Sequence, residues 1–167
     1  MTMESKRLQT AKKYIGHFAT IDTETLASVL SEDHVHQFAP ASLSLPGPFT
    51  KQEFLDHSAR LHRVMTGFPV YAKEYVESES ANQVTVWATG KTQFREEVMN
   101  DDDNGGGSEE GKWVYEGEYV FMLWMDESGE KIRRTVEFLD SKGTEDGLRP
   151  LMKRANEKLG KGDWLGR

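Results

Sequence analysis

The chain has 167 residues, of which 37% are hydrophobic and 29% charged, as expected for one soluble domain with one core. Its formal net charge of −7 argues against a surface that binds the phosphates of nucleic acids. The absence of cysteine excludes disulfides, thiol nucleophiles and cysteine metal sites.

The start of the chain is polar and charged, without the apolar core of a secretory signal. No apolar run approaches the ~18 residues that a membrane-spanning helix requires. We therefore expect an intracellular protein, most simply a cytoplasmic one, that binds neither membranes nor nucleic acids.

Helices are predicted in the first part of the chain. Apolar residues recur at helical spacing over residues 5–19, which indicates an amphipathic helix. Asp22 can cap a second, shorter helix. Thr50 and Glu53 have the spacing of a capping box, so a third helix is expected to start there and to end at Gly67.

Strands follow a different pattern, in which apolar and polar residues alternate. Residues 34–38 alternate in this way between the second and third helices, which predicts a short strand. Residues rich in β-branched and aromatic side chains then predict four longer strands, at 70–77, 84–96, 113–126 and 131–140. Because short turns join most of them, they should form an antiparallel meander.

The element order predicts an α+β fold in which a curved antiparallel sheet wraps around the three N-terminal helices and leaves a blind pocket. Residues 99–112 combine acidic residues with three consecutive glycines and are expected to form a flexible hairpin loop. A further helix is predicted at 144–159. We therefore expect one domain over residues 1–143, with a C-terminal helix and a loose tail over residues 144–167.

Short motifs on several elements resemble a known family. They are residues 34–43 after the second helix, residues 137–140 in the last strand, and Trp113, Tyr115, Gly117 and Tyr119 in one strand. Together with the element order, they make residues 5–142 similar to the SnoaL-like family of the nuclear transport factor 2 and ketosteroid isomerase superfamily, especially to members from fungal biosynthetic pathways.

The resemblance implies a cone-shaped, cystatin-like fold that works without a cofactor. It also implies isomerisation, cyclisation, dehydration or hydrolysis of hydrophobic polyketide or terpenoid intermediates. Related domains serve only as binding or dimerisation modules, so the fold by itself does not choose between these functions.

The candidate catalytic residues lie on the first and the last strand. His34 and His36 project to the same face, and an imidazole transfers protons near neutral pH. Glu137 and Asp140 fall on opposite faces of a regular strand, so only one of them can line the pocket. A carboxyl held among aromatic side chains would have a raised pKa and could act as an acid or base.

The alternatives for these residues are structural. Either histidine could be exposed or hydrogen-bonded in the core, and Glu137 could form a surface ion pair. The two histidines could also bind zinc with a third ligand from another strand, but nothing in the spacing requires this, and no metal is expected.

The candidate substrate-binding residues are aromatic or apolar and come mainly from the long strands. They are Trp87, Tyr115, Tyr119, Met122 and Trp124. Their alternative role is in the core or in a dimer face. His57 lies near the apolar stripe of the third helix and joins the candidates, whereas His17 and His62 are expected at the surface or its boundary.

The strand segment 119–125 is apolar on both faces. Helices would cover only one face of the sheet, so the other is predicted to be buried against a second copy of the chain in a homodimer.

The sequence therefore favours a cofactor-independent isomerase, cyclase or dehydratase, in which His36 moves a proton and Glu137 or Asp140 assists. The alternative is a noncatalytic dimeric module that binds a small ligand or a protein. An enzyme requires at least two titratable groups that converge on one cavity, whereas a binding module requires only an apolar pocket.

Overall fold

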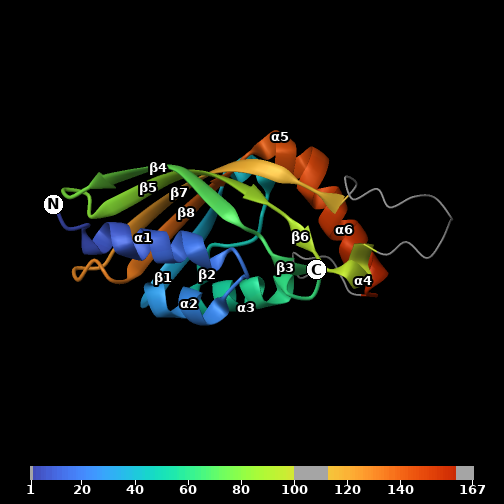
Figure 1. The fold of residues 1–167 in the computed structure, drawn as a ribbon, viewed down its shortest axis with the longest axis horizontal. Helices are drawn as coiled ribbons and strands as arrows, with labels where there is room; N and C mark the ends of the chain where they lie inside the picture. The colour runs from blue at the N-terminus through green and yellow to red at the C-terminus, as the bar shows by residue number, and fades with distance from the viewer. Residues whose placement is uncertain (1, 100–112, 161–167) are drawn as a thin grey trace.

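The computed structural model describes residues 2–99 and 113–160, in which helices pack on one side of a six-stranded sheet (Figure 1). The sheet order is β2 (Phe49–Thr50), β1 (Leu30–Ala39), β8 (Ile132–Leu139), β7 (Glu116–Met125), β5 (Gln83–Lys91) and β4 (Val70–Ser78). The helices on its inner face are α1 (Lys6–His17), α2 (Thr23–Val29) and α3 (Lys51–Leu61). The predicted α+β class is confirmed.

The pairing within the sheet is mixed. Strands β4, β5, β7 and β8 are antiparallel neighbours, as the meander requires. Strand β1 runs parallel to β8, which corrects the expectation of a wholly antiparallel sheet. A short hairpin can join only antiparallel strands. Most of the chain separates β1 from β8, and a connection of this length allows them to pair in parallel.

Helix α3 begins where the sequence predicts but ends earlier. Both hydrogen bonds of the capping box between Thr50 and Glu53 are present. The helix stops at Leu61 rather than at Gly67, and β3 (Met65–Gly67) pairs instead with β6 (Gln93–Phe94) in a separate ribbon. The predicted strand over residues 84–96 is therefore divided into β5 and β6.

The C-terminal segment forms three consecutive helical pieces. They are α5 (Ser141–Gly143), a π-helical turn (Thr144–Leu148) and α6 (Arg149–Lys158), and α4 (Glu96–Met99) lies close to α6. Helices α5 and α6 lie at one end of the sheet (Figure 1). The predicted hairpin tip and tail lie outside the described residues. Within residues 2–99 and 113–160, no helix is long and apolar enough to cross a membrane.

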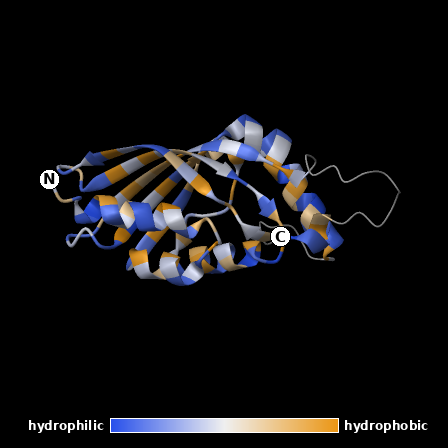
Figure 2. Cartoon of the chain, in the orientation of Figure 1, coloured by the Kyte–Doolittle hydropathy of each residue, from blue (hydrophilic) through white to orange (hydrophobic). Residues whose placement is uncertain are grey.

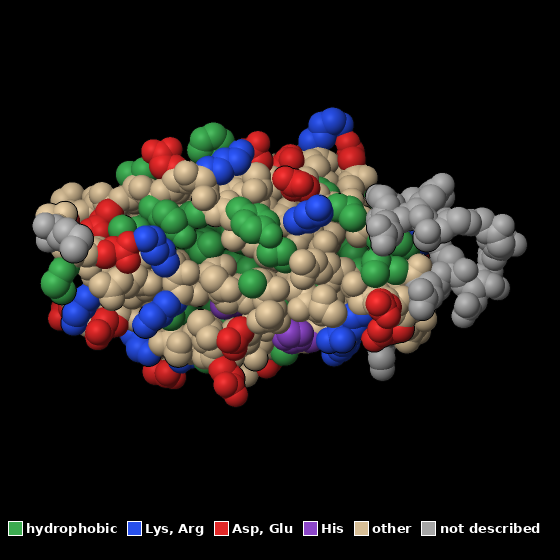
Figure 3. Space-filling model, in the orientation of Figure 1, with side chains coloured by type: hydrophobic (Ala, Val, Ile, Leu, Met, Phe, Trp, Pro, Cys, Tyr) green, Lys and Arg blue, Asp and Glu red, His purple; other side chains and the backbone are tan. Residues whose placement is uncertain are grey.

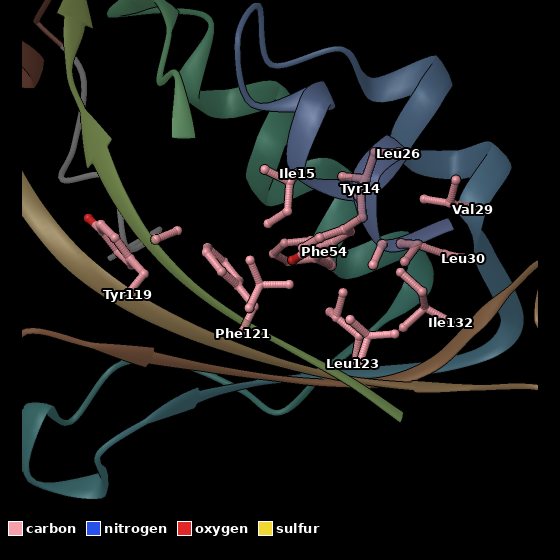
Figure 4. Close-up of a cluster of buried hydrophobic side chains, with 14 of the residues drawn as sticks. Tyr14, Ile15, Leu26, Val29, Leu30, Phe54, Tyr119, Phe121, Leu123 and Ile132 are labelled. Carbon is pink, nitrogen blue, oxygen red and sulfur yellow. The ribbon is translucent and has the colours of Figure 1, made fainter. Parts of the chain in front are cut away.

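The main core lies between the helices and the inner face of the sheet. Tyr119, Phe121 and Leu123 of β7 are buried on this face, and Figure 2 shows the matching alternation of apolar and polar residues along the strands. In Figure 4, Tyr14 and Ile15 of α1 point toward these strand side chains. The alternation fixes which side chains of each strand can reach the interior.

The outer face of the sheet carries an apolar band. Trp87 is directly opposite Val120, and Val120 is directly opposite Phe138, so the three side chains cross β5, β7 and β8 in one row. Trp87 is 44% exposed and Phe138 is 45% exposed. None of the helices α1, α2 and α3 covers this row, because they occupy the opposite face.

Candidate active site

The parallel pairing of β1 and β8 brings His36 and Glu137 together. His36 is opposite Thr135 and Phe38 is opposite Glu137, so all four side chains share the inner face. The Nε2 atom of His36 lies 3.0 Å from Oε2 of Glu137. His36 is fully buried, and Glu137 is 8% exposed.

Aromatic side chains hold the His36 ring in place. It stacks on Phe54 of α3, with ring centroids 3.6 Å apart and planes inclined by 11°. Phe38 meets the same ring edge-on, with centroids 5.0 Å apart. The ring therefore has little freedom, and its Nε2 atom stays directed at the carboxyl group.

Burial keeps both members of this pair uncharged at neutral pH. It raises the pKa of Glu137 from 4.5 to about 8, because the carboxylate loses its hydration. It lowers the pKa of His36 from 6.5 to about 3 for the corresponding reason. The hydrogen bond therefore joins a protonated carboxyl group to a neutral imidazole, and the carboxyl group is the acid of the pair.

A pocket of about 70 Å³ opens beside this pair. Glu137 is one of its lining residues, whereas His36 lies behind Glu137 and Phe54 and does not line it. The walls come from α1, α3, the sheet and the C-terminal helix, and they are mainly apolar: Phe18, Phe38, Phe54, Phe68, Leu139 and Met152. A neutral acid thus faces an apolar space.

His17 is a pocket residue that the sequence analysis missed. The expectation of a surface or boundary position is wrong, because His17 is 2% exposed and lines the pocket. A signal was available: Thr10, Tyr14 and His17 follow one another at spacings of four and three, so they share a face of α1, and all three are buried.

Two of the predicted substrate-binding residues, Tyr119 and His57, line the pocket. Both are buried, with burial raising the pKa of Tyr119 and lowering that of His57 to about 3. Tyr115 is also buried, but in a second cluster with Trp113 and Met152, and it is not part of the pocket lining.

Trp87, Met122 and Trp124 lie away from the pocket. Met122 is three residues beyond Tyr119, and Trp124 is five beyond it, so on a regular strand both side chains project to the opposite face. Trp87 donates from Nε1 to Glu118 on that outer face, at 2.7 Å. The prediction placed side chains from both faces of the sheet in one pocket, and strand alternation forbids this.

His34 and Asp140 occupy structural positions. His34 is buried, and its Nδ1 atom donates to the carbonyl oxygen of Ile132 at 2.9 Å, which ties β1 to the start of β8. Asp140 follows β8 and caps α5 by accepting from the amide of Gly143 at 3.0 Å. The exposed carboxyl group of Asp140 is not among the pocket-lining groups.

The zinc alternative required three ligands at one point. Among the residues that the structure describes, no group of three His, Asp or Glu side chains is arranged to hold a metal ion. Acidic and basic side chains are interspersed over the molecular face shown in Figure 3.

This fold is the nuclear transport factor 2-like fold of SnoaL-like proteins, as solved structures of both descriptions indicate. No protein-family model matches the chain. Over 137 residues it is 28% identical to the austinoid biosynthesis cluster protein H of Aspergillus calidoustus, which covers 80% of this chain and 82% of the relative.

Solved structures of fungal proteins are also similar. AusH from Aspergillus nidulans superposes with a TM-score of 0.65 at 27% identity, over 84% of this chain and 88% of that one. The BvnE pinacolase from Penicillium brevicompactum superposes with a TM-score of 0.70 at 17% identity, over 93% and 94% of the two chains.

The raised pKa of Glu137 predicts a specific loss of stability as pH rises from about 4.5 to about 8. A carboxyl group whose pKa is raised by folding stabilises the protein below the unfolded pKa of 4.5, and this stability is lost as pH rises through about 8. The loss is about 1.4 kcal/mol per pH unit. Glu137→Gln keeps the shape and an oxygen that can accept from His36 but cannot ionise.

We expect the free energy of unfolding of the wild type, measured by urea denaturation, to fall by about 2 kcal/mol relative to Glu137→Gln between pH 6.5 and 8. The buried histidines do not contribute in this window, because His17, for example, has its pKa lowered from 6.5 to about 4, so its stability effect lies below pH 6.5. If the free energies of unfolding of the two proteins changed equally with pH, Glu137 would not be protonated in the folded wild type.

Proposed function

We propose that this protein is a cofactor-independent acid–base enzyme that isomerises, cyclises or dehydrates a hydrophobic polyketide or terpenoid intermediate. The observation that carries the proposal is the neutral carboxyl group of Glu137, held by His36 and facing an apolar pocket. Perturbed acids in apolar pockets are characteristic of catalytic sites.

In this proposal Glu137 and His36 have the opposite roles to those that the sequence suggested. His36 was expected to move the proton, but it does not line the pocket. Glu137 faces the pocket, so it is the group that donates a proton or a hydrogen bond to a carbonyl or hydroxyl oxygen of the substrate. His36 orients the carboxyl group and donates to the carboxylate that forms when the proton leaves.

The similar proteins support the proposed substrate class. One relative bears the name of an austinoid biosynthesis cluster, and one structural neighbour is a pinacolase. These names describe those proteins. They support the proposal because this chain shares their fold and contains an apolar pocket. A hydrophobic intermediate of fungal secondary metabolism fits both lines of support.

The size of the pocket places a condition on binding. Its volume of about 70 Å³ is below the ~300–1,000 Å³ of typical ligand sites. A polycyclic intermediate therefore enters only if wall side chains move. Met152 of α6 is suited to this, because a methionine side chain is unbranched and adapts its shape easily.

Glu137→Gln tests the proposed acid. We expect the turnover of a polycyclic terpenoid ketone or lactone, followed by liquid chromatography and mass spectrometry, to fall ~10²–10⁴-fold. In the wild type, kcat/KM should fall as pH rises through about 8, because the active carboxyl group is the protonated one. Glu118→Gln, on the outer face beside Trp87, is the matched control and should retain turnover.

Full turnover by Glu137→Gln would rule out this carboxyl group as the acid. Unchanged binding of the same compounds by both proteins, without turnover by the wild type, would favour the noncatalytic binding module instead.

We also propose that the outer face of the sheet pairs with a second copy of the chain. Trp87 and Phe138 are half exposed there, and charges of both signs flank the apolar band. Lys73 lies 4.4 Å above the ring of Trp87, and the Glu118 carboxyl group accepts from its Nε1 atom. A face that carries both signs beside an apolar band can complement a copy of itself.

Phe138→Glu tests this dimer. We expect the wild type to have twice the chain mass of 19.0 kDa by light scattering at micromolar concentration, and the variant to have the mass of one chain. Charge in an apolar interface is strongly unfavourable, so association should weaken and the variant should be mainly monomeric. A wild type that is monomeric at all concentrations would contradict the proposal.

A further inference from the structure

His17 is a titratable side chain that lines the pocket, and the function proposed above does not use it. The residue is the last of α1, is 2% exposed and lines the same pocket as Glu137. Its ring packs against Phe18 and Tyr14, with centroids 4.1 and 5.2 Å away, so its position is fixed.

The hydrogen bond of His17 determines which ring nitrogen can accept a proton. Nδ1 contacts the carbonyl oxygen of Tyr14. A carbonyl oxygen can only accept, so Nδ1 must carry the hydrogen, and Nε2 of the neutral ring must carry the lone pair. The main chain of α1 thus holds His17 in the tautomer of a base.

The surroundings of His17 keep it neutral. Burial is the largest influence and lowers its pKa to about 4; the Tyr14 carbonyl and then Asp22 act against it, and His36 adds the smallest effect, in the direction of burial. At neutral pH the lone pair of Nε2 is therefore available.

His17 and Glu137 come from different walls of the pocket. Helix α1 supplies the neutral imidazole, and strand β8 of the facing sheet supplies the protonated carboxyl group. An acid and a base on different walls can act on two atoms of one substrate at the same time. His36 cannot serve as this base, because its Nε2 atom is bonded to Glu137 at 3.0 Å.

We propose that His17 is the catalytic base and that the substrate is an enolisable carbonyl compound, bound with its oxygen at Glu137 and its adjacent C–H at His17. Nε2 takes the proton of that C–H bond. The electron pair of the C–H bond becomes the C=C bond of an enol, while the carbonyl oxygen takes the proton of Glu137.

The protons then return. The imidazolium of His17 gives its proton back to the same or another carbon, and the enol O–H returns its proton to the Glu137 carboxylate. The sequence of steps is balanced without an oxidant, a reductant or a cofactor. The inference rests on the proposed acid–base function and adds to it the base and the chemical class of the substrate.

Hydrogen exchange at the α carbon tests the base directly. The probe is cyclohexanone in D₂O, and proton NMR follows the loss of its α-hydrogen signal in the presence of enzyme. We expect His17→Gln and His17→Asn to slow the catalysed exchange ~10²–10⁴-fold. The Asn variant retains a donor for the Tyr14 carbonyl, so its loss of rate would not result from a broken helix terminus.

His62→Gln is the matched control. Like His17, His62 contacts a main-chain carbonyl oxygen, that of Ile21 at 2.7 Å, but it does not line the pocket. Its exchange rate should equal that of the wild type. Wild-type exchange rates in both His17 variants, together with loss in Glu137→Gln, would overturn the role of His17 alone. Absence of exchange in the wild type would overturn the acid–base function and, with it, this inference.

The tautomer gives a readout that needs no substrate. In protein labelled with ¹⁵N-histidine, the His17 signals should be those of a neutral ring protonated at Nδ1 throughout pH 6–8, because its pKa is about 4. A ring protonated at Nε2, or one charged at pH 7, would contradict the proposal whether or not any probe binds.

Discussion

The hydrogen bond between His36 and Glu137 is the constraint on which the account of this protein depends. Two ionisable side chains lie in the core, 3.0 Å apart, where hydration cannot stabilise a charge on either. Burial therefore favours the neutral form of both, and the carboxyl group keeps its proton at a pH where an exposed glutamate would have lost it. The fold maintains an acid in an apolar space.

The mixed sheet makes this contact possible. Parallel pairing of β1 with β8 sets His36 opposite Thr135, so Glu137 follows two residues further on the same inner face. A shift of one residue in this register would turn Glu137 to the outer face and Phe138 to the pocket. Helix α3 then places Phe54 against His36, and α1 closes the opposite wall with His17. The site therefore depends on long-range pairing as much as on local sequence.

The sequence predicted those features that depend on local chemistry. The capping box of α3, the meander and the shared face of His34 and His36 all follow from spacing, and the structure contains them. The parallel partner of β1 was not predictable, because no local pattern encodes which distant strand it meets. The same pairing determines that Glu137 lines the pocket and that His36 lies behind it.

The errors in the predicted site have a common cause. Met122 and Trp124 were predicted to line the pocket with Tyr119 as aromatic or apolar side chains, although the period of a strand places them on the opposite face. His17 was predicted at the surface or its boundary, yet its spacing from Tyr14 places it on the buried face of α1. In both cases periodicity was a better guide than residue type.

The protonation state of Glu137 at neutral pH is the central claim, and infrared spectroscopy measures it most directly. A protonated carboxyl group has a C=O stretching band that is separate from those of carboxylates and amides. We expect this band in the wild type at pH 7, its loss as pH rises through about 8, and its absence in Glu137→Gln. A wild-type spectrum without the band at pH 7 would show an ionised Glu137 and would contradict the account.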